Sequence, residues 1–231
     1  MNVLALDTTL GACSAAVAHG DPEAPTIRGR YELREREHAE AIIPMIEAVL
    51  TDASTRYEAL NAIAVTTGPG SFTGVRVGIA TARALALALD LPVIGATSLE
   101  VMARKALDEL KDSPDALGIA VDARRAQVYF ALFDGRGEVR SAPQALAPAA
   151  AAELLPRRAR VVLAGGGAEL VRRAAANAGE FEAVLPALQP DARVLARVAM
   201  TRTPQDEPLH PLYLRAPDAK PQSGKAIPRR L

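Results

Sequence analysis

One segment, residues 66–87 (TTGPGSFTGVRVGIATARALAL), limits what this chain can fold into more than any other. Gly68, Pro69 and Gly70 end the apolar run at residues 62–65, because glycine accepts a positive φ in a tight turn and proline fixes φ. Ser71 follows at the position of a helix N-cap, ahead of an apolar helical pattern over about residues 72–89. The segment therefore predicts a strand, a tight turn and a capped helix in succession.

The predicted helix carries a small residue at every fourth position. Gly74, Gly78 and Ala82 share one face, which is therefore nearly bare of side chains. Another element must pack very close to that face, either the sheet of the same chain or a helix of a partner.

Four motifs, in order along the chain, resemble the TsaB family of bacterial proteins. They are ALDTT at residues 5–9, PGSFTGVRVGIATARALA at residues 69–86, DARRAQVY at residues 122–129 and PLYLR at residues 211–215. TsaB proteins are non-catalytic relatives of the TsaD enzymes, which install threonylcarbamoyladenosine (t6A) next to the tRNA anticodon. The resemblance spans nearly the whole chain and implies an α/β fold of the two-lobed actin-like or Hsp70-like (ASKHA) class.

Composition is that of a soluble globular protein, with 49% hydrophobic residues in a chain of 231. The 27 basic residues are balanced by 27 acidic ones, so the chain lacks the basic excess typical of a protein that holds tRNA by itself. Cys13 is the only cysteine and lies in an apolar strand pattern, which predicts a buried, inert thiol and a reducing compartment.

The N-terminal and internal apolar runs favour a cytoplasmic protein that does not cross a membrane. Asp7 interrupts the N-terminal apolar run too early for a signal peptide. The run closest to a membrane span is ATARALALALDLPVIGA, which Arg83 and Asp90 break.

Apolar periodicity predicts the order β-β-β-α-β-α-β-α before a polar break at residues 112–115, after which the pattern restarts. VLALDTTLGACSAAVA and LGIAVDARRAQVYFAL each give an apolar strand, an aspartate, a turn and a second strand. We therefore expect a first lobe at residues 1–111, a second, smaller lobe at 112–210 and a partly flexible tail at 211–231, each lobe holding a mixed sheet with flanking helices. The basic tail is either loosely held or a secondary contact to RNA, and Ser98 is expected to cap the helix over residues 98–110.

Two segments are candidates for a weak adenine-nucleotide site. Asp7, Thr8 and Thr9 lie where actin-like ATPases place hydroxyls and backbone N–H groups around phosphate, although the same residues also suit the closing of a hairpin. Gly165, Gly166 and Gly167 resemble the adenosine loop of that superfamily, although a glycine-rich strand-to-helix turn is common without any ligand. ATP or ADP is thus a candidate ligand, bound weakly or at a complex interface, and no cofactor is required.

The second-lobe counterpart of the first turn is DARRA at residues 122–126. A phosphate hairpin needs glycine and serine or threonine there, so that the backbone can approach the ligand closely. Arg124 and Arg125 stand there instead. They could meet an anion, bridge to a protein partner or lie in solvent.

Enzymatic motifs are incomplete in this chain. The GPGSFTG turn lacks the lysine of a P-loop, and Pro69 and Thr73 occupy the glycine positions of a nucleophile elbow. In TsaD enzymes two histidines, four residues apart, bind the catalytic metal in the segment that matches residues 95–102. Ser98 and Met102 replace them here, and neither is a plausible ligand for that metal. The resemblance thus implies a subunit without catalytic or metal-binding residues.

The resemblance also implies a partner and a surface. TsaB proteins pair with TsaD through two first-lobe helices, and a TsaE-type ATPase completes the complex, through which alone tRNA would be met. The residues expected at this interface, which would also permit a homodimer when TsaD is absent, are His38, Ile42, Met45, Val49, Gly74, Gly78 and Ala82.

Two other functions stay open at this point. An active small-molecule kinase or acyltransferase on the actin-like fold would need an intact second phosphate loop, against which DARRA argues. A metallopeptidase would need the histidine pair that Ser98 and Met102 replace.

Overall fold

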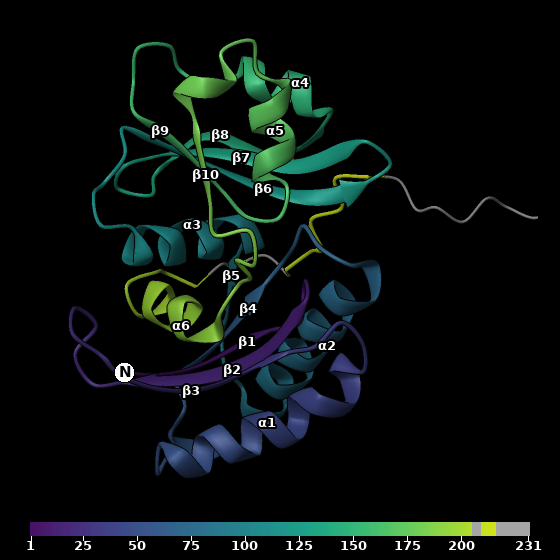
Figure 1. Cartoon of the computed structure of the whole chain (residues 1–231). Helices are drawn as coiled ribbons and strands as arrows, with labels where there is room; N and C mark the ends of the chain where they lie inside the picture. The colour runs from purple at the N-terminus through teal and green to yellow at the C-terminus, as the bar shows by residue number, and fades with distance from the viewer. Residues whose placement is uncertain (205–208, 216–231) are drawn as a thin grey trace, which may run out of the picture.

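A computed structural model describes residues 1–204 and 209–215 (Figure 1). The N-terminal half forms a five-stranded sheet with the strand order β3-β2-β1-β4-β5. Strands β2 and β3 run antiparallel to their neighbours, whereas β4 and β5 run parallel to β1. The strands are β1 (Asn2–Asp7), β2 (Ala12–His19), β3 (Thr26–Leu33), β4 (Ala62–Thr66) and β5 (Val93–Ala96).

The second sheet repeats this plan, with the order β8-β7-β6-β9-β10 and the same alternation of antiparallel and parallel pairs. Its strands are β6 (Ala116–Arg124), β7 (Gln127–Asp134), β8 (Val139–Leu146), β9 (Val161–Ala164) and β10 (Glu182–Val184). Because each strand of one sheet has a counterpart at the same place in the other, the repeat read from the sequence is confirmed, and so is the two-lobed actin-like fold class.

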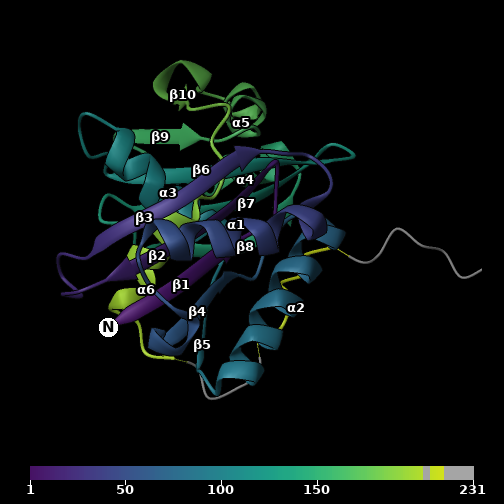
Figure 2. The ribbon, with the colours of Figure 1, turned by 90° about the horizontal axis from the view of Figure 1, so that it is seen from below.

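Two helices, α1 (His38–Asp52) and α2 (Phe72–Leu89), cover the outer face of the first sheet (Figure 2). Their apolar residues and those of β1, β2 and β4 form one continuous core. The second lobe carries the shorter helices α4 (Pro148–Glu153) and α5 (Ala168–Ala174), and two 3₁₀ turns lie at η1 (Tyr57–Ala59) and η2 (Ala178–Glu180).

The last helix of each half of the chain packs on the sheet of the other half. Helix α3 (Ser98–Glu109) follows β5 but packs on the second sheet, where Leu99 and Met102 lie among residues of β6, β7 and β9. Helix α6 (Ala192–Met200) follows β10 but packs on the inner face of the first sheet. Figure 1 shows both helices between the two sheets.

This exchange bears on the expected lobe boundaries. The break at residues 112–115 does separate the two sheets, but α3 lies before it and α6 after it. The lobe boundary at residue 111 therefore stays a prediction. It separates the strands of the two sheets, but α3 and α6 each pack on the sheet beyond it. The sequence left open where the chain returns to the first lobe; α6 is that return. Of the expected tail, residues 211–215 are described and residues 216–231 lie outside the described part.

The local predictions for residues 66–87 and the helix that follows them in the sequence are largely confirmed. Strand β4 and helix α2 have the expected bounds, Gly68 has φ 101°, and the Ser71 hydroxyl accepts a hydrogen bond from the Gly74 N–H at 3.0 Å. The expected cap of α3 was wrong by one residue. Thr97, not Ser98, accepts the hydrogen bond from the Glu100 N–H, because the chain already has helical geometry at Ser98.

Helix α2 is the one helix within residues 1–204 and 209–215 whose length and composition would let it cross a membrane, and 33% of it is buried in the chain. The expectation that Arg83 and Asp90 break the run closest to a membrane span was therefore too strict, since Arg83 lies inside this helix. An apolar core helix of a globular protein meets the same test, and α2 packs on the first sheet.

Candidate functional site

The carboxylate of Asp7 lies at the carboxyl end of β1 and is fully buried. Its Oδ1 accepts hydrogen bonds from the hydroxyls of Thr9 at 2.6 Å and Thr66 at 2.5 Å, and from the Thr9 N–H at 3.3 Å. Its Oδ2 has no hydrogen-bond partner among the described residues, and neither has Nε2 of His38. Burial raises the pKa of Asp7, against the lowering effect of the threonine hydrogen bonds and of nearby His38.

The bare face of α2 packs on the turn that follows β1. The Thr8 hydroxyl donates a hydrogen bond to the Gly74 carbonyl at 2.7 Å. A methyl group at Gly74 would collide with the Thr8 carbonyl oxygen, and one at Gly78 would lie 2.7 Å from the Thr8 hydroxyl oxygen. These glycines therefore allow a close contact inside the chain, which is why the sequence needs them.

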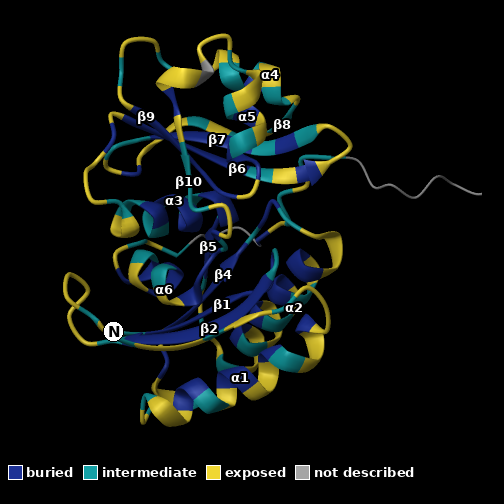
Figure 3. Ribbon diagram, viewed as in Figure 1, coloured by how far each residue is buried: buried dark blue, intermediate teal, exposed yellow. Residues whose placement is uncertain are grey.

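This geometry corrects the expected interface. All seven residues expected at a partner surface are buried within this chain, including Val49 and Ala82 with no exposed surface. Figure 3 shows buried segments, in dark blue, alternating with exposed ones, in yellow, along α1 and α2. His38, Ile42 and Met45 face the first sheet from α1, and Gly74, Gly78 and Ala82 face it from α2. The exposed sides of α1 and α2 are the opposite ones.

The opposite side of α2 carries small and apolar residues beside two exposed arginines, Arg76 and Arg83. We call this the outer face of α2: Val77, Ala80, Ala84, Leu87 and Ala88. Ala80, Ala84 and Ala88 are exposed, and 86% of Leu87 is exposed. On the neighbouring α1, Ile43 is 42% exposed. The sequence analysis missed these residues; the signal was an apolar stripe on each side of α2, of which a sheet can cover only one.

The three glycines expected to bind a nucleotide, at residues 165–167, follow β9. Gly165 has φ 102° and is buried, so that a methyl group there would lie 2.5 Å from the Ala120 carbonyl oxygen. A methyl group at Gly167 would lie 3.0 Å from the Val121 carbonyl carbon of β6, whereas Gly166 is exposed. The glycines thus permit tight packing of the turn on β6. No hydrogen bond among the described residues joins them to Asp7, Thr8 or Thr9, and the nucleotide site stays a prediction.

Ser98 and Met102 lie at the junction of the two lobes and are fully buried. The Ser98 hydroxyl donates to the Pro69 carbonyl, and its N–H donates to the Gly68 carbonyl at 2.8 Å, so α3 begins against the glycine–proline turn. Residues 1–204 and 209–215 contain no cluster of three or more His, Cys, Asp or Glu that could hold a metal ion. Burial raises the pKa of the Cys13 thiol to about 12, as expected for an inert cysteine.

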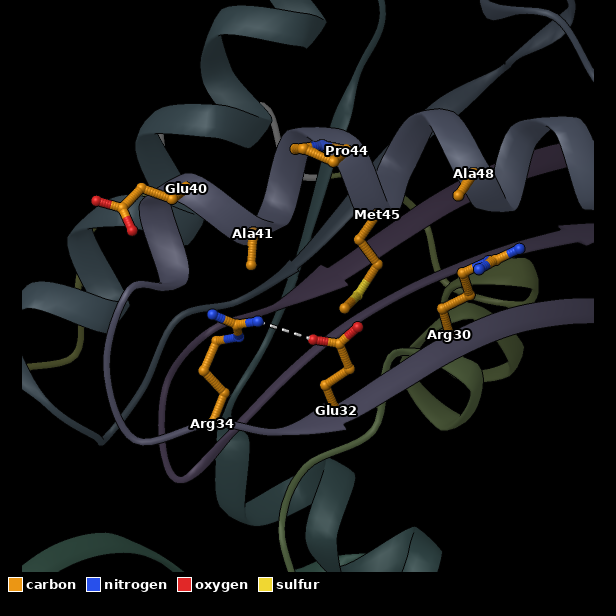
Figure 4. Close-up of a pocket in the computed structure, with 8 residues that line it drawn as sticks. All are labelled: Arg30, Glu32, Arg34, Glu40, Ala41, Pro44, Met45 and Ala48. Carbon is orange, nitrogen blue, oxygen red and sulfur yellow. Dashed lines mark hydrogen bonds and ion pairs between the residues drawn. The ribbon is translucent and has the colours of Figure 1, made fainter.

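A pocket of about 380 Å³ lies between α1 and the edge strand β3 (Figure 4). Arg34 binds Glu32 at 3.1 Å inside it, and Arg30 binds Asp52 at 2.8 Å beside it. These ion pairs join both arginines to carboxylates of the same chain, although Nε of Arg34 has no hydrogen-bond partner among the described residues. Of the residues expected to bind a nucleotide or a partner, only Met45 lines this pocket.

Comparison with known proteins identifies the family to which the chain belongs. Residues 32–199 match the model of the family described as "TsaD: tRNA N6-adenosine threonylcarbamoyltransferase". The tRNA threonylcarbamoyladenosine biosynthesis protein TsaB of Escherichia coli is 41% identical over 133 residues, which are 58% of this chain and 55% of that protein. Its counterpart in Haemophilus influenzae is 40% identical over 56% of this chain and 52% of that protein. The matches thus span about half the length of these TsaB proteins.

Two other relatives match nearly end to end. An uncharacterized protein of Mycobacterium tuberculosis strain H37Rv is 36% identical over 95% of this chain and 94% of its own length. A crystal structure of an uncharacterized Pseudomonas aeruginosa protein, described as similar to peptidase YEAZ, superposes with a TM-score of 0.78 at 31% identity, over 93% of this chain and 99% of that one. From its fold, its sequence and these matches, the chain is a member of the TsaD/YeaZ family.

Proposed function

We propose that this chain is a TsaB-type accessory subunit in t6A synthesis, which binds a catalytic TsaD subunit and stabilises it during threonylcarbamoyl transfer to tRNA. The names of the Escherichia coli and Haemophilus influenzae relatives support the pathway. The burial of Asp7, Thr8 and Thr9, and the replacement of the metal-binding histidines by Ser98 and Met102, support an accessory rather than a catalytic role.

The observation that carries the proposal is the outer face of α2. Helices of soluble proteins usually keep polar residues on the side away from the core. Here that side presents alanines and the 86% exposed Leu87 beside the exposed Arg76 and Arg83, and the neighbouring α1 presents the exposed Ile43. Small side chains let another helix approach closely, so a pair of helices from a related subunit would complete a four-helix packing.

In this proposal the chain works in the cytoplasm, needs no cofactor of its own, and meets tRNA and a TsaE-type ATPase only within the complex. ATP or ADP bound weakly, or at the interface with TsaD, stays part of the proposal. An isologous contact through the same helices would give a homodimer when TsaD is absent.

The test is the replacement of Ala84 by arginine. Ala84 is exposed on the outer face of α2, so the fold should tolerate the change, whereas a buried, unpaired guanidinium should disrupt a helix–helix contact. We expect the wild-type chain to co-elute with the TsaD of its own organism at micromolar concentration, and Ala84→Arg to raise the Kd by about tenfold or more.

The matched control is Ala174→Arg, at the exposed C-terminal end of α5 in the second lobe. It adds the same side chain and should leave the Kd unchanged. Separate elution of the wild-type chain and TsaD, or equal binding by Ala84→Arg, would refute the proposed docking.

A further inference from the structure

Strand β3 forms an open edge of the first sheet. It pairs antiparallel with β2 along its whole length, and just beyond it the Arg34 N–H donates to the Gly11 carbonyl at 3.0 Å. Because hydrogen bonds alternate along an antiparallel pair, every second residue of β3 points its N–H and carbonyl away from β2. These residues are Ile27, Gly29, Tyr31 and Leu33. Within residues 1–204 and 209–215, no acceptor receives a hydrogen bond from their four N–H groups.

The other edge strands in the described part of the chain are poorly suited to pairing. Strand β5 has four residues and β10 has three, while β8 contains Pro143 and shifts in register against β7. Short edges, proline and irregular pairing all keep a sheet from adding a strand. Strand β3 has eight residues with neither a proline nor a shift in register, and its Leu33 is 74% exposed. It is therefore the edge to which a further strand can be added.

The pocket of about 380 Å³ lies between this strand and α1. Ala41, Met45 and Ala48 of α1 give it an apolar wall, and Figure 4 shows the Met45 side chain pointing toward the side chains of β3. Arg34 also lines the pocket, and its buried Nε has no hydrogen-bond partner among the described residues. Buried donors are nearly always paired, so an acceptor on a ligand would complete this site. The pocket thus fits an apolar side chain whose own backbone carries hydrogen-bonding groups.

The charged side chains of β3 on the side of α1 leave one position without a counter-charge. Arg30 binds Asp52 and Glu32 binds Arg34, so these side chains are held toward α1 and do not cover the open edge. Arg28 is exposed and makes only a hydrogen bond of 3.4 Å to the carbonyl of the residue before it. No carboxylate binds it within the described residues. Opposite charges stabilise cross-strand pairs, so an added strand would carry an acidic residue opposite Arg28.

We propose that β3 and α1 form a docking groove for an extended peptide segment of another protein. The segment pairs antiparallel with the open edge of β3, where main-chain hydrogen bonds supply affinity and side chains supply specificity. It places an apolar side chain in the pocket, opposite Glu32, and an acidic side chain opposite Arg28. The apolar residue therefore precedes the acidic one by four positions, on the same face of the strand. This groove is separate from the outer face of α2 and does not depend on the proposed binding of TsaD.

The probe is a phage-displayed library of random peptides, each of about twelve residues, enough to cover a strand of ordinary length. Selection on the immobilised full chain should enrich peptides with an apolar residue four positions before an acidic one. Fluorescence anisotropy of the most enriched peptide, labelled, then gives its Kd. Arg28→Glu should raise that Kd about tenfold by repelling the acidic side chain, and Ala48→Phe should raise it about tenfold or more by filling the pocket.

Arg157→Glu and Ala149→Phe make the same changes at exposed positions of the second lobe and should leave the Kd unchanged. Ala84→Arg, on the outer face of α2, should also leave it unchanged, which separates this groove from the proposed TsaD contact. Thermal unfolding checks that each variant is folded, and Arg28→Glu carries the test if Ala48→Phe is not.

Three results would overturn the groove. The first is a selection that enriches no peptide, and the second is a Kd that the folded groove variants leave unchanged. The third is a wild-type chain that dimerises in gel filtration and loses the dimer with Arg28→Glu, because the open edge would then bind a second copy of the chain instead.

Discussion

The side chain of Asp7 combines a position typical of a phosphate-binding loop with complete burial. The sequence placed it correctly at a strand end before a turn, because the apolar run of β1 and the following threonines are local signals. It could not show that Thr66, 59 residues away, supplies a hydrogen bond that turns the carboxylate inward. Contacts between distant segments decide such orientations, and periodicity carries no information about them.

The raised pKa of Asp7 gives a prediction for Asp7→Asn. The folded chain keeps the Asp7 proton to a higher pH than the unfolded chain, whose carboxyl titrates near 3.8, so this group lowers stability as pH rises through that window. Asparagine keeps the Oδ1 acceptor and does not titrate. The free energy of unfolding of Asp7→Asn minus that of wild type should therefore increase from pH 3 to pH 7 in urea titrations. A difference that falls with pH would contradict the assignment.

Gly74 gives a second prediction at this scale. A methyl group there collides with the Thr8 backbone, which cannot move without shifting β1, so Gly74→Ala should lower the free energy of unfolding by about 3 kcal/mol. Ala80→Ser, at an exposed position on the same helix, should stay within about 0.5 kcal/mol of wild type. Urea denaturation of the two variants checks this; similar stabilities would mean that α2 does not pack on Thr8 as described.

The bounds of helix α2 could be predicted from the sequence, but its orientation on the sheet could not. Its bounds followed from the glycine–proline turn and the Ser71 cap, which are local. Its orientation did not follow, because one stripe holds Gly74, Gly78 and Ala82 and the other holds Ala80, Ala84 and Ala88, and both are small enough for close packing. Only the position of the sheet decides which stripe is buried. Helix α6 was missed altogether, although the Asp191 cap and the apolar residues at helical spacing behind it are local signals. That it packs on the sheet of the other lobe could not be predicted from them.

The N-terminus of α6 gives the prediction at this scale. Asp191 is buried and caps the helix by accepting from the Arg193 N–H at 2.9 Å, while the Arg193 guanidinium binds the same carboxylate. Burial acts to raise the pKa of Asp191, but these hydrogen bonds from Arg193 hold it below the usual value. Asp191→Ala should lower the free energy of unfolding at pH 7 by about 1–2 kcal/mol.

The pH dependence of that loss has a definite sign. A carboxyl with a lowered pKa stabilises the fold above its unfolded pKa, and the stabilisation disappears as pH falls through the folded pKa. The gap between wild type and Asp191→Ala should therefore narrow below about pH 4, the ordinary range of an aspartate. Denaturant titrations at pH 7 and pH 3 measure it, and a gap that widens in acid would contradict the account.

At the scale of the whole molecule, the two lobes are connected on both sides. Near α6, Gln189 accepts from the Gly11 N–H at 2.8 Å, and Lys105 of α3 donates to the Gln189 carbonyl at 3.3 Å. Elsewhere, residues 209–215 run from the first lobe to Ala123 of the second. The sequence predicted two lobes from their repeat but could not predict these connections, which depend on contacts between segments far apart in the chain.

Leu209 tests the second connection. Its side chain is buried against Gly95, where a methyl group would lie 2.7 Å from it, and it belongs to the core of the first lobe. Leu209→Ala should lower the free energy of unfolding by about 3 kcal/mol. Leu33→Ala, at a side chain that is 74% exposed, is the matched control and should change it by less than about 0.5 kcal/mol. Equal effects in urea denaturation would place residue 209 outside the core.

The accessory role itself is tested most directly by measuring t6A formation on tRNA by the TsaD and TsaE-type subunits of the same organism, with and without this chain. We expect product only when the chain is present, about tenfold less with Ala84→Arg at limiting concentration, and normal product with Ala174→Arg. Full t6A formation without the chain, or equal formation with Ala84→Arg and wild type, would contradict the account.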